Sequence, residues 1–114
     1  EFGQYALGAN GVSVKINSMC TVFAESEVIS LIAKNEDGRR IALGLHEAIS
    51  ERITGMARRV GLKQNIIFAG GVAKNPCITR LLSQKLRQEL TVPDEPQIVG
   101  ALGAAIIASV KRKT

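Results

Sequence analysis

The sequence NIIFAGGVAKNP, residues 65–76, decides how this chain is expected to fold. Asn65–Ala69 predicts a short buried strand that ends at Gly70 and Gly71. Asn75 and Pro76 predict the start of a helix, because asparagine caps helix N-termini and proline suits the first turn. Glycines before a helix N-terminus can let a flat or anionic ligand approach the backbone N–H groups. A tight strand-to-helix turn without a ligand explains the same letters, so both interpretations stay open.

Helical patterns surround this stretch. Before it, we expect helices over about residues 2–9, 18–34 and 39–60, and a strand at Val12–Ile16. After it, we expect a helix from Asn75, a brief strand at Thr91–Val92 and a last helix from about Glu95. This order predicts a mixed α/β fold class. The side chains expected to face the core from the 39–60 helix are Ile41, Leu45, Ile49, Ile53, Met56 and Val60. Those expected from the helix that follows Asn75 are Ile78, Leu81, Leu82, Leu86 and Leu90.

The composition indicates a folded protein of one domain or a piece of one. The chain has 114 residues, 46 % hydrophobic residues and a net charge of +5, which excludes an intrinsically disordered chain. Its cations are interleaved with acids, so we expect no nucleic-acid partner. The apolar run Ile98–Val110 is too short for a membrane span and predicts a buried helix. Without a secretory signal, the chain is expected to be cytoplasmic and to have no internal domain boundary.

Cysteine is the residue type that most invites a functional reading. Cys20 lies at an expected helix N-terminus, where the helix dipole stabilises a thiolate or an anionic metal–thiolate cluster. One cysteine cannot hold an iron–sulfur cluster, which generally needs four thiolates, and a packed thiol remains the alternative. Cys77, in the first turn of the helix after Pro76, could be a second ligand or a redox thiol, and we interpret it as a packed thiol. His46 has no Ser or Cys partner in a recognisable motif, so we interpret it as a surface or packed residue.

Four blocks of sequence carry a family resemblance. They are KINSMCTVFAESEVI at 15–29, IALGLHEAI at 41–49, GGVAKNP at 70–76 and PQIVGALGAA at 96–105. Together they resemble the ATP-dependent activators of 2-hydroxyacyl-CoA dehydratases and the related ATP-binding subunits of benzoyl-CoA reductase. That family has the actin-like fold of sugar kinases and heat-shock chaperone ATPases. The resemblance covers roughly its C-terminal half, so residues 1–114 are expected to be a C-terminal subdomain fragment.

The resemblance implies two cofactors. Cys20 matches one of two cysteines per subunit that hold a single 4Fe–4S cluster between the subunits of a homodimer. ATP or ADP with Mg binds at the adenosine motif, and the residues that match or border this motif here are Gly70, Gly71, Lys74, Asn75 and Gln97.

The resemblance also implies a reaction. The family uses ATP hydrolysis to drive transfer of a low-potential electron to an acyl-CoA dehydratase or reductase. Its phosphate-binding loops and second cluster cysteine lie upstream of the matching segment. We therefore expect this chain alone neither to hydrolyse ATP nor to hold the usual cluster, and no catalytic residue is assigned within it.

Two other functions stay open from the sequence. The chain could belong to a sugar or acetate kinase of the same fold, although the block around Cys20 would have no role there. It could also be a non-catalytic module for nucleotide sensing and dimerisation. In that case the stripe Gly100, Ala104 and Ala108 would pack between chains.

Overall fold

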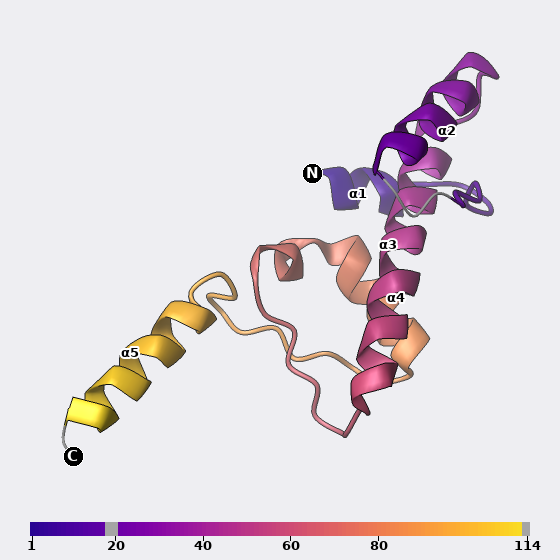
Figure 1. Ribbon diagram of the computed structural model, residues 1–114. Helices are drawn as coiled ribbons and strands as arrows, with labels where there is room; N and C mark the ends of the chain where they lie inside the picture. Colours follow the sequence, from indigo (N-terminus) through magenta and orange to yellow (C-terminus); the bar gives the residue numbers. More distant parts are fainter. Residues whose placement is uncertain (18–20, 113–114) are drawn as a thin grey trace.

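The computed structural model describes residues 1–17 and 21–112 and is predominantly helical (Figure 1). Its Cα radius of gyration is 17.4 Å, with extents of 63 × 27 × 26 Å, whereas a compact domain of this length has a radius of about 13 Å. The molecule is therefore elongated. Its elements are α1 (Phe2–Leu7), α2 (Thr21–Ala33), α3 (Gly38–Val60), the 3-10 helix η1 (Gly71–Lys74), α4 (Pro76–Leu86) and α5 (Val99–Arg112).

The ends of α3 and α4 follow local sequence signals. The Asp37 side chain accepts a hydrogen bond from the backbone N–H of Arg39 and caps α3, and Gly61 ends that helix with a positive φ of 84°. At α4, Asn75 is the N-cap and Pro76 is the first helical residue. These boundaries confirm the predicted helix that ends before Gly61 and the predicted helix start at Asn75.

The core lies where α1, α3 and α4 meet. One cluster of buried residues contains Ala6, Ala42 and Cys77. The other contains Ile78, Leu82 and Leu90, with Phe68 and Ile53 among the partly buried residues packed against it. The predicted inner face of α4 is confirmed, since Ile78 and Leu82 are each only 2 % exposed.

The predicted inner face of α3 is wrong in its C-terminal half. Ile49, Met56 and Val60 are exposed, Val60 by 88 %. The buried residues of α3 are instead Ile41, Ala42, Gly44, His46, Ser50 and Thr54. Four of these, at positions 42, 46, 50 and 54, recur every four residues and so share one side of the helix. The α1 and α4 helices pack on α3, and this burial of small and polar side chains overrides the pattern of large apolar ones.

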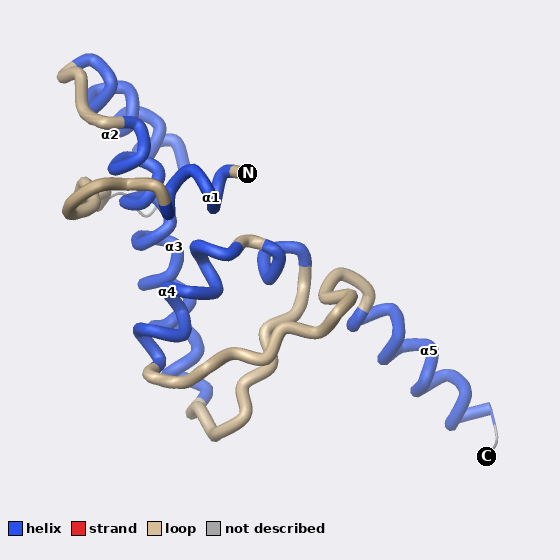
Figure 2. Tube along the Cα trace, turned by 180° about the vertical axis from the view of Figure 1, so that it is seen from behind, coloured by secondary structure: helices blue, strands red, loops and turns tan. Residues whose placement is uncertain are grey.

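No β-strand forms within residues 1–17 and 21–112, so the expected α/β class is wrong for this part of the molecule (Figure 2). Residues 65–69 and 91–92 were expected to be strands, and they form only a parallel bridge between Ile67 and Thr91. The N–H of Phe68 donates to the Thr91 carbonyl at 2.8 Å, and the N–H of Thr91 donates to the Ile66 carbonyl at 3.0 Å. A sheet needs further paired strands, and these described residues provide a single pairing.

The third expected strand, Val12–Ile16, is an extended segment beside α3. The N–H of Val14 donates to the Arg40 carbonyl at 3.3 Å, and Arg40 Nε donates to the Val12 carbonyl at 2.7 Å. Gly44 makes this close approach possible, because a Cβ at that position would overlap the Val14 carbonyl oxygen. The segment leads toward α2, but Cys20 lies outside the described residues.

Helix α5 stands apart from the other helices (Figure 1). In the part of the chain that the structure describes, α5 packs against none of the other helices, and none of its residues is buried. The prediction of a buried helix at 98–110 is therefore wrong here. Among the described helices, none has the length and apolar character needed to cross a membrane.

Candidate nucleotide-contacting loop

The segment from Gly70 to Lys74 forms a tight loop between the Ile67–Thr91 bridge and α4. Gly70 has φ 100° and ψ 174°, a backbone conformation that is essentially restricted to glycine. Its N–H donates to the Pro96 carbonyl at 2.7 Å, and its carbonyl accepts from the N–H of Ala73 at 3.1 Å. The turn itself therefore requires glycine at position 70. This agrees with the interpretation of these residues as a tight turn that needs no ligand.

One side of the loop is nevertheless open. A Cβ added to Gly70 would meet no heavy atom within 4 Å, and one added to Gly71 would lie 3.3 Å from Gln97 Nε2. The fold thus brings together three of the predicted site residues, Gly70, Gly71 and Gln97. An open glycine backbone beside an amide side chain fits a flat, polar ring such as a nucleobase. Lys74 is exposed at the end of η1.

Asn75 faces the interior of the protein. Its Oδ1 accepts hydrogen bonds from the backbone N–H groups of Cys77 at 3.0 Å and Ile78 at 3.2 Å. Its Nδ2 lies 3.0 Å from His46 Nε2. Two of the N–H groups that the start of α4 was expected to offer to a ligand are therefore bonded to Asn75. The predicted contact of Asn75 with a nucleotide stays a prediction.

His46 is buried in α3, with 1 % of its surface exposed. Its Nδ1 lies 2.7 Å from the Ala42 carbonyl oxygen, and the Phe2 ring packs on it with 4.7 Å between the ring centroids. Because a carbonyl only accepts, Nδ1 is assigned the proton, and Nε2 then accepts from Asn75. The sequence left His46 as a surface or packed residue. Its spacing of four from Ala42 and Ser50 was the available signal for the buried side.

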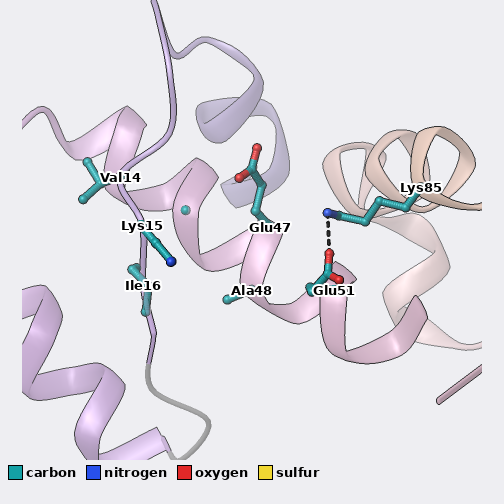
Figure 3. Close-up of a pocket in the computed structure, with 8 residues that line it drawn as sticks. Val14, Lys15, Ile16, Glu47, Ala48, Glu51 and Lys85 are labelled. Carbon is teal, nitrogen blue, oxygen red and sulfur yellow. Dashed lines mark hydrogen bonds and ion pairs between the residues drawn. The ribbon is translucent and has the colours of Figure 1, made fainter. Parts of the chain in front are cut away.

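A separate pocket of about 170 Å³ lies beside α3, where the extended segment at 14–16 passes that helix (Figure 3). It is lined by the extended segment at Val14–Ile16, by Lys85 of α4, and by four residues of α3, which are Gly44, Glu47, Ala48 and Glu51. Lys85 Nζ forms an ion pair with Glu51 Oε2 at 2.8 Å. The hydrogen bond and the positive charge of Lys85 lower the pKa of Glu51. The pair joins α3 to α4, which indicates a structural role for these two residues.

Comparison with known families identifies this chain. The BadF/BadG/BcrA/BcrD ATPase family matches residues 6–108. This chain belongs to that family. The family relationship agrees with the resemblance carried by the four sequence blocks.

Relatives within the BadF/BadG/BcrA/BcrD ATPase family include dehydratase activators. The 2-hydroxyisocaproyl-CoA dehydratase activator of Clostridioides difficile is 41 % identical over 108 residues, which are 95 % of this chain and 40 % of that protein. The solved structure of the activator of 2-hydroxyisocaproyl-CoA dehydratase from Clostridium difficile with bound ADPNP matches with a TM-score of 0.89 and 39 % identity. That match covers 98 % of this chain and 41 % of the other.

A second solved structure gives the same result. The Acidaminococcus fermentans (R)-2-hydroxyglutaryl-CoA dehydratase component A matches with a TM-score of 0.92 and 37 % identity, over 99 % of this chain and 43 % of that one. The described helices therefore adopt the same arrangement as a portion of these activator structures. The chain spans about two fifths of the length of the relatives it matches.

The structure describes one of the two cysteines of this chain, Cys77. Cys20, the predicted cluster ligand, lies outside the described residues. Within residues 1–17 and 21–112, no group of three or more His, Cys, Asp or Glu side chains is placed to hold a metal ion. Cys77 is fully buried, and burial raises the pKa of its thiol while the charge of Arg80 opposes that shift. A buried thiol with a raised pKa fits the predicted packed role of Cys77.

Proposed function

We propose that this chain forms part of the adenosine-binding side of an ATP-dependent activator that delivers an electron to a 2-hydroxyacyl-CoA dehydratase. The observation that carries the proposal is the open Gly70–Gly71 backbone beside Gln97. It lies in a family member whose relative of known structure has ADPNP bound. A benzoyl-CoA reductase is the alternative electron acceptor.

The loop residues have separate roles in this proposal. The backbone of Gly70 and Gly71 supports the adenine ring, because a side chain at Gly70 would occupy the open side of the loop. Gln97 offers an amide that can both donate to and accept from a base or ribose. Lys74, exposed at the end of η1, adds a positive charge near the nucleotide. Bound ATP with Mg would supply the free energy of hydrolysis, and we assign no residue of this chain to that cleavage.

The remaining parts of the proposal concern the larger assembly. The chain corresponds to about two fifths of its relatives, and we propose that it is the C-terminal portion of an actin-like, cytoplasmic protein. Cys20 offers one thiolate, whereas a 4Fe–4S cluster generally needs four. The other three would come from a second copy in a homodimer and from a cysteine outside residues 1–114 of each copy.

Titration with ADP tests the nucleotide site. In the full-length protein, Gly70→Ala places a side chain at a backbone conformation that costs a non-glycine residue about 1–3 kcal/mol. The dissociation constant should rise about 5- to 150-fold if binding requires this loop conformation. Gly11→Ala is the matched control, because Gly11 also has a positive φ and open space around it but is distant in sequence from the loop. Absence of ADP binding by the wild type, or unchanged binding by Gly70→Ala, would refute the proposed site.

Iron analysis tests the role of Cys20. The full-length protein prepared without oxygen should contain iron and acid-labile sulfide, and Cys20→Ala should lose both. Cys77→Ala should retain them, because that thiol is buried in the core. A normal cluster content in Cys20→Ala would show that Cys20 is not a ligand.

A further inference from the structure

We propose that His46 is a positioning residue that holds the Gly70–Lys74 loop in place through Asn75. The effect on nucleotide affinity rests on the function proposed above, whereas the effect on loop structure does not. His46 lies in α3, and its hydrogen bonds run to Ala42 and Asn75 and not to the loop glycines. Its influence on a bound nucleotide would therefore be indirect.

A continuous series of hydrogen bonds carries the inference. Nδ1–H of His46 donates to the Ala42 carbonyl at 2.7 Å, which sets the orientation of the imidazole ring. Nε2 then accepts from Asn75 Nδ2 at 3.0 Å. Asn75 Oδ1 accepts from the N–H groups of Cys77 and Ile78. Both ends of the Asn75 amide therefore have partners, and exchanging its oxygen and nitrogen would break all three bonds that it makes.

Helix α1 closes the space around this pair. The Phe2 ring packs on the imidazole at an interplanar angle of 45°. Gly3 lies so close that a Cβ there would overlap Asn75 Oδ1. The imidazole is almost wholly excluded from solvent, so water cannot easily replace a lost hydrogen bond. Leaving the buried imidazole nitrogen without a partner costs free energy, so the hydrogen bond between His46 and Asn75 is favoured.

Asn75 transmits this constraint to the loop. It directly follows Lys74, and its own N–H donates to the Val72 carbonyl at 2.9 Å. The other end of the loop is held by the bond from the Gly70 N–H to the Pro96 carbonyl. Fixed ends hold the Gly70 backbone, which has no side chain to pack, in one conformation. The His46–Asn75 bond is the link from that loop to α3.

A pair of amide substitutions separates the two bonds of His46. In His46→Gln, the longer side chain reaches the position of Nε2 and can accept from Asn75. In His46→Asn, the shorter side chain reaches only the position of Nδ1 and can donate to Ala42. Ser50→Ala is the control, since Ser50 is buried on the same side of α3 and its hydroxyl has no hydrogen-bond partner among the described residues.

Amide chemical shifts and ADP titration are the two measurements, both on the full-length protein. In His46→Asn, the ¹H–¹⁵N signals of Gly70 and Gly71 should move, and the ADP dissociation constant should rise about two- to tenfold, as expected for the loss of one hydrogen bond. His46→Gln and Ser50→Ala should leave both close to the wild type. Unmoved glycine signals in His46→Asn, or equal effects in His46→Gln and His46→Asn, would overturn the positioning role.

A second variant covers the case in which His46→Asn does not fold. Asn75→Ser keeps a side-chain acceptor at the N-cap of α4, but its shorter side chain does not reach His46. The glycine signals should move in this variant as well. If the wild type binds no ADP, the proposed function fails, and the glycine signals still decide whether His46 positions the loop.

Discussion

Replacing Gly44 with alanine tests the contact that places the extended segment 12–16 against α3. A Cβ at Gly44 would overlap the Val14 carbonyl oxygen and lie 3.6 Å from Ile16 Cδ1. Gly55 lies in the same helix, and a Cβ there would meet nothing within 4 Å. The two substitutions therefore make the same chemical change in one helix, with and without a steric conflict.

The expected effects on the free energy of unfolding have opposite signs. Alanine is favoured over glycine in a helix by about 0.8–1 kcal/mol, so Gly55→Ala should stabilise the protein by about that amount. At position 44 the same gain is opposed by displacement of the segment. Three hydrogen bonds join that segment to α3, namely Val14–Arg40, Val12–Arg40 and Ser13–Glu47. Each is worth about 0.5–1.5 kcal/mol, and the burial of Ile16 adds about 1.5–3 kcal/mol.

Partial displacement loses only a fraction of that total. Inserting a methyl group into a packed contact typically costs about 1–3 kcal/mol, so after the helix gain of about 1 kcal/mol Gly44→Ala should have a net destabilising effect of up to about 2 kcal/mol. Urea unfolding followed by far-ultraviolet circular dichroism measures both variants against the wild type. The reasoning is refuted if Gly44→Ala raises the unfolding midpoint as Gly55→Ala does.

Three further predictions concern the core, a thiol and an ion pair. Leu82→Ala should reduce the free energy of unfolding by about 2–5 kcal/mol, because Leu82 is buried, whereas Leu102→Ala on the exposed surface of α5 should change it by less than about 0.5 kcal/mol; equal losses in urea melts would contradict this. Burial raises the pKa of Cys77, so its thiol in the native Cys20→Ala protein should resist iodoacetamide at pH 8 and react once urea unfolds the chain; rapid native alkylation, detected by mass spectrometry, would be inconsistent with it. Lys85 lowers the pKa of Glu51 from its ordinary 4.5, so the pair's contribution is complete above that value and is lost as the pH falls through the lowered value. The thermal midpoint of Glu51→Gln should therefore depend less on pH in this range, and identical curves for the variant and the wild type would argue against the pair.

Local sequence signals predicted the helix ends better than the packing. Asn75 caps α4 through its side chain and Gly61 adopts the positive φ that ends α3, both as predicted. Asp37, which was not predicted, caps α3 in the same way. Each signal acts over a few residues, so it can be recognised without knowing the rest of the fold.

The buried side of α3 depended on its partners. The spacing of large apolar residues favoured Ile49 and Met56, but α1 and α4 cover the side that contains Ala42 and Ser50. Strands were predicted for a related reason. Residues 65–69 have the composition of a buried strand, yet a strand is defined by hydrogen bonds to neighbours, and only Thr91 pairs with this segment in the described residues.

For the candidate site too, the sequence predicted local features and missed contacts between distant residues. The sequence placed Gly70 and Gly71 at a turn before a helix, the resemblance named Gln97, and the structure places Gln97 beside Gly71. It could not show that Asn75 points inward or that His46 is its partner, because that bond joins residues 29 positions apart. The role of Cys20 rests on the resemblance alone.

The apolar surface of α5 has a practical consequence for anyone who handles these 114 residues alone. Four apolar side chains of α5 are each more than half exposed, namely Leu102, Ile106, Ile107 and Val110. An exposed apolar stripe of this kind favours self-association and binding to other apolar surfaces. A preparation of these residues should bind a dye such as ANS and be retained on a hydrophobic column. Spectroscopy and calorimetry on it are therefore best done at low protein concentration and compared across dilutions, so that self-association is not mistaken for a ligand effect.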